Sequence, residues 1–92
     1  MFADKIMRYL SQGQESKKII EILLSLTKIK EPMQDAIVDH LVRGFSVSDA
    51  ANLNDVRSNN LSVAIRDLNA VAAKVERINE LKTYDKSHTN KG

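Results

Sequence analysis

The chain has 92 residues, of which 42% are hydrophobic and 28% are charged, a composition that excludes disordered and fibrous proteins. Cysteine is absent, which excludes disulfide bonds and thiolate zinc sites and fits a reducing compartment. The formal net charge of +2 is too small to indicate a nucleic-acid ligand by itself.

The N-terminal sequence MFADKIMRYL lacks the apolar core and the cleavage site of a signal peptide. No apolar run in the chain approaches the ~20 residues of a membrane span, so we expect a cytoplasmic protein with no membrane partner. Apolar stretches at residues 2–10 and 19–26 are separated by polar residues around Gly13. They predict two helices, or one interrupted helix.

The second of these stretches is apolar around nearly its whole circumference. A helix on the surface of a small monomer could not bury all of these side chains, so we expect a contact between subunits. The alternative is a helix sandwiched within one chain. The oligomerisation residues predicted in this stretch are Ile19, Ile20, Leu23, Leu24 and Leu26.

A further helix is predicted over residues 32–43. Pro32 suits its first turn, where a missing backbone N–H costs nothing, and apolar side chains recur along it at spacings of three and four. Gly44 can adopt the left-handed conformation that ends a helix. Ser46 can then cap a short helix that runs to about Leu53.

Residues 46–68 have the spacing of a helix-turn-helix. Two helices that cross steeply through a short turn need small side chains where they approach, and Ala50 and Ala51 provide them. The turn needs a residue that tolerates a left-handed conformation, followed by an apolar side chain that inserts between the helices. Asp55 and Val56 occupy these positions. A helical hairpin that never contacts DNA is the alternative interpretation.

The second helix of this motif is expected to bury Leu61, Ile65 and Leu68 and to expose a polar face. Arginine can bond guanine, asparagine can bond adenine, serine can bond bases or phosphate, and valine can contact a thymine methyl group. The predicted DNA-binding residues are Ser46, Ser48, Arg57, Ser58, Asn59, Asn60, Ser62, Val63 and Arg66. For Asn60, capping the helix or lying half buried are alternatives.

A long last helix is predicted to reach about Leu81. Apolar residues recur at spacings of 3, 4, 3, 4 and 3 at Leu61, Ala64, Leu68, Val71, Val75 and Ile78. This stripe is either a dimer seam or a face that packs on the N-terminal helices of the same chain. Its predicted oligomerisation residues are Val71, Val75 and Ile78. We expect one domain over residues 1–82 and a flexible basic tail over residues 83–92.

The run AIVDHLVRGFS at residues 36–46, the helix-turn-helix after it and the run NAVAAKV at residues 69–75 resemble the PapB-type regulators of fimbrial (adhesin biosynthesis) operons in enteric bacteria. The likeness covers roughly residues 19–75. It implies an all-helical, self-associating transcription regulator, activator or repressor, that binds repeated AT-rich DNA sites cooperatively as a homodimer or higher oligomer.

That resemblance also implies DNA contacts at Arg57, Ser58 and Asn59, which match the polar start of the family's recognition helix. The family usually has asparagine at the position of Arg57 and aromatic residues near Asn60 and Leu61. This chain departs from the pattern where bases would be read. A plasmid-maintenance repressor of the KorA (TrfB) kind carries a similar helix-turn-helix and is the nearest alternative.

Other classes of function have less support in the sequence. Of the two histidines, His40 lies in a predicted helix and His88 in the predicted tail, and there is no glycine-rich phosphate loop. We therefore predict no enzyme, no catalytic or metal-binding residue, no cofactor and no small-molecule ligand. A protein-interaction module that uses the apolar stretch at residues 19–26 is the stronger rival.

Overall fold

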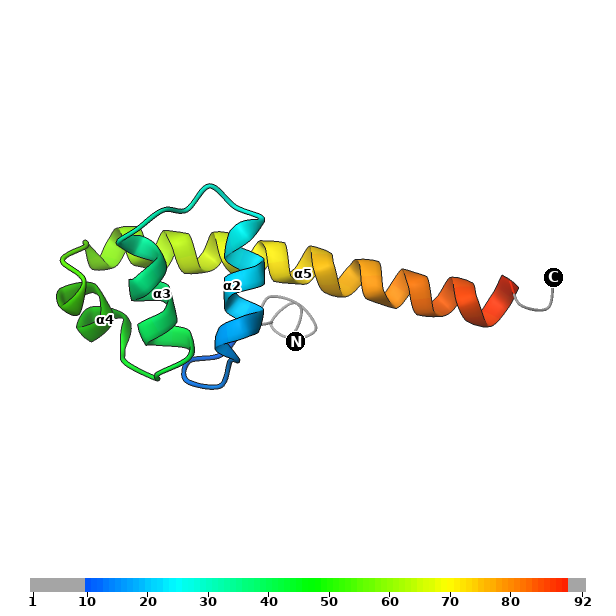
Figure 1. Ribbon diagram of the computed structural model, residues 1–92, viewed down its shortest axis with the longest axis horizontal. Coiled ribbons are helices and arrows are strands. Elements are labelled where there is room, and N and C mark those ends of the chain that lie inside the picture. The colour runs from blue at the N-terminus through cyan, green and yellow to red at the C-terminus, as the bar shows by residue number, and fades with distance from the viewer. Residues whose placement is uncertain (1–9, 90–92) are drawn as a thin grey trace.

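The computed structural model describes residues 10–89, with side chains described up to residue 83. Over this range the chain is all-helical, as predicted, with α2 (Lys17–Ser25), α3 (Met33–Leu41), α4 (Val47–Leu53) and the long α5 (Ser58–Thr89). The first half of α5 lies along the other three helices, and its second half projects from them (Figure 1). The helix predicted over residues 2–10 lies outside the described residues, apart from Leu10.

All four helices contribute to one hydrophobic core. Its largest side chains with no more than 1% exposure are Ile20, Ile37, Leu41, Leu61 and Leu68. The buried residues of helix α4 are the small Ala50 and Ala51, so it packs close to its neighbours, and Val47 lies half-buried against the same core. No helix among residues 10–89 combines the length and the hydropathy needed to cross a bilayer.

Helix α2 divides its apolar side chains between the core and the surface. Ser16 caps its start, its hydroxyl oxygen accepting from the Ile19 N–H at 3.4 Å. Ile20, Leu23 and Leu24 are buried within the single chain. Their prediction as oligomerisation residues is therefore corrected, because they pack on α3 and α5 of the same molecule. Ile19 and Leu26 do lie at the surface, 52% and 58% exposed.

Helix α3 is shorter than the predicted range of residues 32–43, because it begins after Pro32 and ends at Leu41. Gly44 follows with φ of +87°, and the Phe45 N–H donates back to the Asp39 carbonyl oxygen at 3.0 Å. This is the left-handed helix end that the sequence predicted at Gly44.

The segment before α2 docks on that same end of α3. The Gly13 N–H donates to the His40 carbonyl oxygen at 3.1 Å, and the Glu15 N–H donates to the Leu41 carbonyl oxygen at 3.0 Å. The Gln12 side-chain amide donates to the Gly44 carbonyl oxygen at 2.9 Å. These bonds satisfy carbonyl groups that the end of a helix leaves without intrahelical partners.

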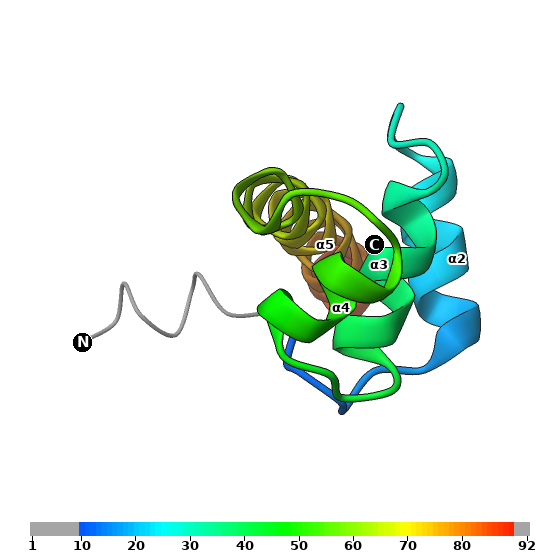
Figure 2. The same cartoon turned by 90° about the vertical axis from the view of Figure 1, so that its left-hand side faces the viewer.

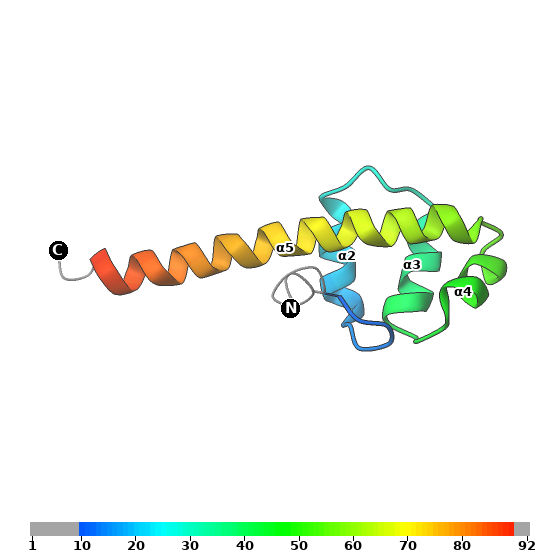
Figure 3. The same ribbon diagram turned by 180° about the vertical axis from the view of Figure 1, so that it is seen from behind.

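Helix α5 continues past Leu81 to Thr89, visible from behind in Figure 3. The helix therefore runs beyond its predicted end at about Leu81, and the flexibility of the tail over residues 83–92 stays a prediction. The tail has no apolar periodicity, but it also has no glycine or proline before Gly92, so nothing in the sequence breaks the helical backbone. Residues 90–92 lie outside the described residues.

The apolar stripe of α5 changes its environment along the helix. Leu61, Ala64 and Leu68 are buried against the other helices, and Val71 and Val75 are half-buried. Ile78 is 53% exposed. Packing within the chain is thus the correct alternative for the first half of the stripe, whereas none of the described residues buries its distal end.

Candidate nucleic-acid interface

Helix α4 is a short helix with a defined start and end. The Ser46 hydroxyl oxygen accepts from the Asp49 N–H at 3.0 Å, which is the cap expected from the sequence. At the other end, the Asn54 N–H donates to the Ala50 and Ala51 carbonyl oxygens, both at 3.3 Å. The predicted end at Leu53 is confirmed.

The turn between α4 and α5 has the predicted chemistry. Asp55 is the one residue other than glycine with positive φ among those described, at +56°. The next residue, Val56, is half-buried against the core, and its N–H donates to the Ala51 carbonyl oxygen at 3.0 Å. The chain reverses sharply here, and α4 and α5 leave the turn in different directions (Figure 2).

A second anchor of this turn was not anticipated from the sequence. The Asn54 side-chain amide donates to an Asp39 carboxylate oxygen and to the Ala50 carbonyl oxygen, both at 2.8 Å. The other Asp39 carboxylate oxygen lies 3.4 Å from an Arg43 guanidinium nitrogen. The turn is therefore tied to α3. Asn54 and Asp39 are far apart in the chain, so no local pattern could predict this bond.

The first three turns of α5 have one buried and one exposed face. Leu61 and Leu68 are fully buried and Ile65 is half-buried. Seven of the predicted DNA-binding residues are exposed together on and just before these turns: Arg57, Ser58, Asn59, Asn60, Ser62, Val63 and Arg66. The alternatives for Asn60 are wrong, because it is exposed and lies inside the helix rather than at its cap. Because an α-helix starts here, N–H groups of its first turn also lack helical partners.

Ser46 and Ser48 lie at the opposite end of the motif, at the start of α4, and both are exposed. The Ser46 hydroxyl is engaged in capping α4. The first role of Ser46 is therefore structural. No hydrogen bond of the Ser48 hydroxyl is found among the described residues. Phosphate oxygens are ligands that such an exposed hydroxyl can bind.

His40 has a structural environment rather than that of a metal ligand. It is 9% exposed, and its Nδ1 lies 2.8 Å from the Phe45 carbonyl oxygen. No group of three or more histidine, cysteine, aspartate or glutamate side chains arranged to hold a metal ion occurs among the residues described. His88 lies where side chains are not described.

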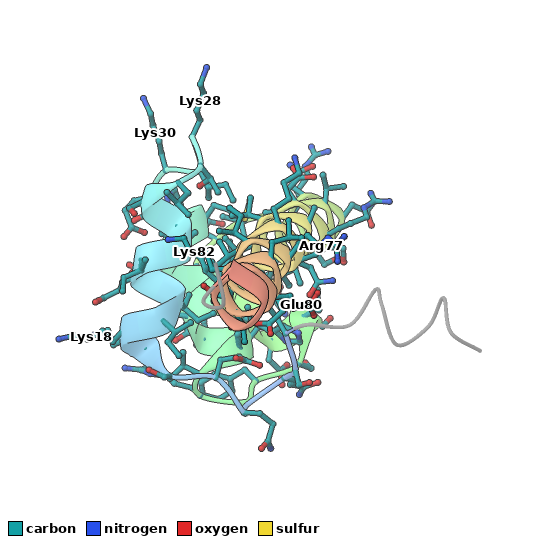
Figure 4. The ribbon with its side chains drawn as sticks, turned by 90° about the vertical axis from the view of Figure 1, so that its right-hand side faces the viewer. Lys18, Lys28, Lys30, Arg77, Glu80 and Lys82 are labelled. Atoms are coloured by element: carbon teal, nitrogen blue, oxygen red, sulfur yellow. The ribbon has the colours of Figure 1, made fainter. Side chains whose placement is uncertain are left out.

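Three lysines of the remaining surface lie apart from the exposed face of α5. Viewed along α5 from its C-terminal end, Lys28 and Lys30 project from the loop between α2 and α3, and Lys18 points away from α5 (Figure 4). Arg77 and Glu80 lie on the projecting half of α5, with a guanidinium nitrogen 3.5 Å from a carboxylate oxygen. None of these lysines belongs to the exposed face of α5.

Comparison with known proteins adds no relative to this picture. No protein-family model, curated protein or solved structure matches the chain. The resemblance to PapB-type regulators therefore stays a prediction.

Proposed function

We propose that the protein is a DNA-binding transcription regulator whose reading surface is the exposed start of α5. The observation that carries the proposal is the joint exposure of Arg57, Asn59, Ser62 and Arg66 on a helix held by a tight turn. These side chains offer donors that suit guanine, adenine and phosphate, and Val63 offers a methyl contact. A helix with this exposed polar start and a second helix packed behind it is the arrangement that reads a DNA groove.

The sequence argues against a purely structural role for this face. Asparagine and serine are weaker helix formers than alanine or glutamate, yet the first turns of α5 expose Ser58, Asn59, Asn60 and Ser62. Stability alone would favour other residues at these positions. Polar groups that can donate and accept at base edges account for them.

We further propose that the protein acts as a homodimer joined through the projecting half of α5. A groove of about 270 Å³ lies where this half leaves the globule. Its apolar lining includes Ile19 and Val75, and Glu15 and Glu76 also line it.

Beyond the groove, the same helix exposes Ile78 (53%) and Leu81 (44%), followed by Lys82. A second copy aligned antiparallel would bring its own Leu81 and Lys82 to this groove. Its lysine would then face the two glutamates, so the two copies are complementary in both hydrophobicity and charge.

The likeness to PapB-type regulators narrows the proposed target to repeated AT-rich sites near a fimbrial operon. Selection of binding sites from random DNA tests this target, because it assumes no operator sequence. Enrichment of AT-rich repeats supports that target, whereas another enriched sequence supports a regulator of a different operon, such as a plasmid repressor of the KorA kind.

The proposal is tested by fluorescence anisotropy with a selected duplex and with random duplex at ~50 to 200 mM salt. Affinity should fall steeply as salt rises, because bound phosphates release counterions. Arg57→Gln and Asn59→Ala should weaken specific binding about tenfold or more. Lys18→Gln, which removes one positive charge on α2 away from α5, is the matched control.

Two results would contradict DNA binding. The first is no binding to any duplex at the lowest salt. The second is an equal loss of affinity in Arg57→Gln and Lys18→Gln, which would leave only a general effect of net charge. A stable dimer that binds no DNA would instead favour the protein-interaction module.

A further inference from the structure

A pocket of about 400 Å³ opens beside the exposed face of α5. Three segments that are distant in the chain form its walls: residues 10–12, the end of α3 and the second to fourth turns of α5. Ser62 and Arg66 belong both to the pocket and to the proposed reading surface. The pocket is therefore adjacent to any duplex held by α5.

The walls of the pocket are fixed by hydrogen bonds. The Asn69 side-chain oxygen accepts from the Leu10 N–H at 2.9 Å, which joins α5 to the N-terminal wall. The Gln12 side-chain amide is held by the Gly44 carbonyl oxygen. Leu10 and Ile65, both half-buried, contribute apolar lining. The site is thus preformed.

The charges of the lining favour an anion. Arg66 and His40 are its ionisable residues, and no carboxylate of a described residue lines it. A groove of similar size between α2 and α3 has more acidic than basic residues in its lining, which contains Glu21, Glu31, Asp35 and Asp39 together with Lys17 and Arg43. The linings of the two depressions therefore differ in the sign of their net charge, and they suit ligands of opposite charge.

His40 also lines the pocket. Its Nδ1 faces the Phe45 carbonyl oxygen at 2.8 Å, and a carbonyl oxygen only accepts, so Nδ1 carries a proton. The other ring nitrogen is then left for a partner other than Phe45. The Ser62 hydroxyl and the Arg66 guanidinium group line the same pocket and can donate to a tetrahedral oxyanion.

We propose that this pocket binds a phosphate group. The inference deepens the proposed function, since the nearest source of phosphate is the backbone of a duplex read by α5, and free inorganic phosphate has the same chemistry. Arg66 lies about 13 Å along α5 from Arg57. A phosphate held here would fix the position of the backbone while the first turn of the helix reads bases.

The first experiment needs no DNA. Inorganic phosphate is titrated into the full-length protein at constant ionic strength, with amide and imidazole resonances followed by NMR and sodium chloride as the reference. We expect saturable shifts at His40, Ser62 and Arg66. Arg66→Gln and Ser62→Ala, both exposed positions, should each weaken phosphate binding at least fivefold. Arg57→Gln, an arginine of the same face outside the pocket, should leave it unchanged.

The second experiment measures DNA affinity against salt for the same variants. Arg66→Gln should lower the slope of log affinity against log salt by about one, and Ser62→Ala should weaken binding to specific and random DNA alike. If the protein binds phosphate but no DNA, the phosphate pocket is supported and the proposed function is contradicted.

The inference is overturned if chloride produces the same shifts as phosphate, or if Arg66→Gln and Arg57→Gln bind phosphate equally. The inference is also overturned if the protein binds DNA but Arg66→Gln changes DNA affinity no more than Lys18→Gln does. The proposed reading surface on α5 would then still stand.

Discussion

Asp55 determines where α5 begins and how it leaves α4. Its φ of +56° lies in the left-handed region, where the Cβ of a residue other than glycine crowds the backbone at a cost of about 1 kcal/mol. This cost is smaller for aspartate than for most residues. The conformation persists because Val56 on one side and Asn54 on the other are held by the core and by α3.

We expect Asp55→Ala to lower the free energy of unfolding by about 1 kcal/mol relative to Asp55→Gly, because only glycine adopts this φ without strain. At Asn52, an exposed position inside α4, the order should reverse, and Asn52→Gly should be less stable than Asn52→Ala by up to about 1 kcal/mol. Urea unfolding of the four variants measures both differences. The same order at both positions would contradict a left-handed turn at residue 55.

Gly13 and Gly44 form a close backbone contact that depends on their missing side chains. Both have positive φ, +70° and +87°. A Cβ on Gly13 would lie 3.0 Å from the Gly44 Cα, whereas a Cβ on Gly44 would lie 3.5 Å from the Gly13 Cα, an ordinary contact. The segment before α2 can therefore cap α3 only because position 13 is glycine.

This geometry predicts an order of stabilities. Gly44→Ala carries the backbone strain alone, about 1 kcal/mol, and Gly13→Ala carries the same strain plus the steric conflict. We expect Gly13→Ala to lose more stability in urea unfolding, and its amide at position 15, which donates to the Leu41 carbonyl oxygen, to exchange faster with deuterium. Equal losses in the two variants would mean that the backbones separate at no cost.

At the scale of the element, α4 shows how a short helix depends on its ends. With Val47–Leu53 as its full length, it has few internal hydrogen bonds, so its cap contributes a large share of its stability. Ser46 and Ser48 were both predicted to contact DNA, and only the first has a capping bond in the structure. Substitution separates the two roles.

Ser46→Ala should lower the free energy of unfolding by about 1 kcal/mol, because the Asp49 N–H loses its acceptor. Ser48→Ala should change stability by less than about 0.5 kcal/mol. Thermal unfolding of both variants, compared at one protein concentration, measures the difference. If Ser48→Ala is the more destabilised of the two, the cap does not form as described.

Features that depend on local chemistry were predictable from the sequence. The cap at Ser46, the left-handed residue at 55 and the apolar insertion at Val56 each follow from a few neighbouring residues, and each is confirmed. The exposed face of α5 was predictable too, because its apolar positions recur with helical periodicity.

Features that depend on tertiary partners were not predictable. In α2, nothing in the sequence distinguishes Ile20, which is buried, from Ile19 beside it, which is exposed, because the choice belongs to α3 and α5. The bond from Asn54 to Asp39 and the phosphate pocket likewise combine segments whose distance in the chain hides their proximity.

The molecule as a whole is elongated, measuring 55 × 30 × 19 Å, because α5 extends beyond the helices that it packs against. A helix in water without a packed face has little stability of its own. The projecting half nevertheless exposes Ile78 and Leu81 on its surface. Pairing with a second copy would bury these side chains, which the described residues leave exposed.

Ile78→Glu should therefore shift the protein from dimer to monomer in sedimentation velocity, because a charge in an apolar seam loses its hydration on pairing. Far-ultraviolet circular dichroism should retain the helices of the globule, since Ile78 lies outside the core. Asn52→Glu adds the same charge on α4 and should leave the dimer intact.

Cooperative binding to adjacent DNA sites should weaken in Ile78→Glu while intrinsic affinity for a single site is retained, because the reading surface is on the opposite half of α5. Should Ile78→Glu sediment as the parent protein does at every concentration, the projecting half of α5 is not the seam.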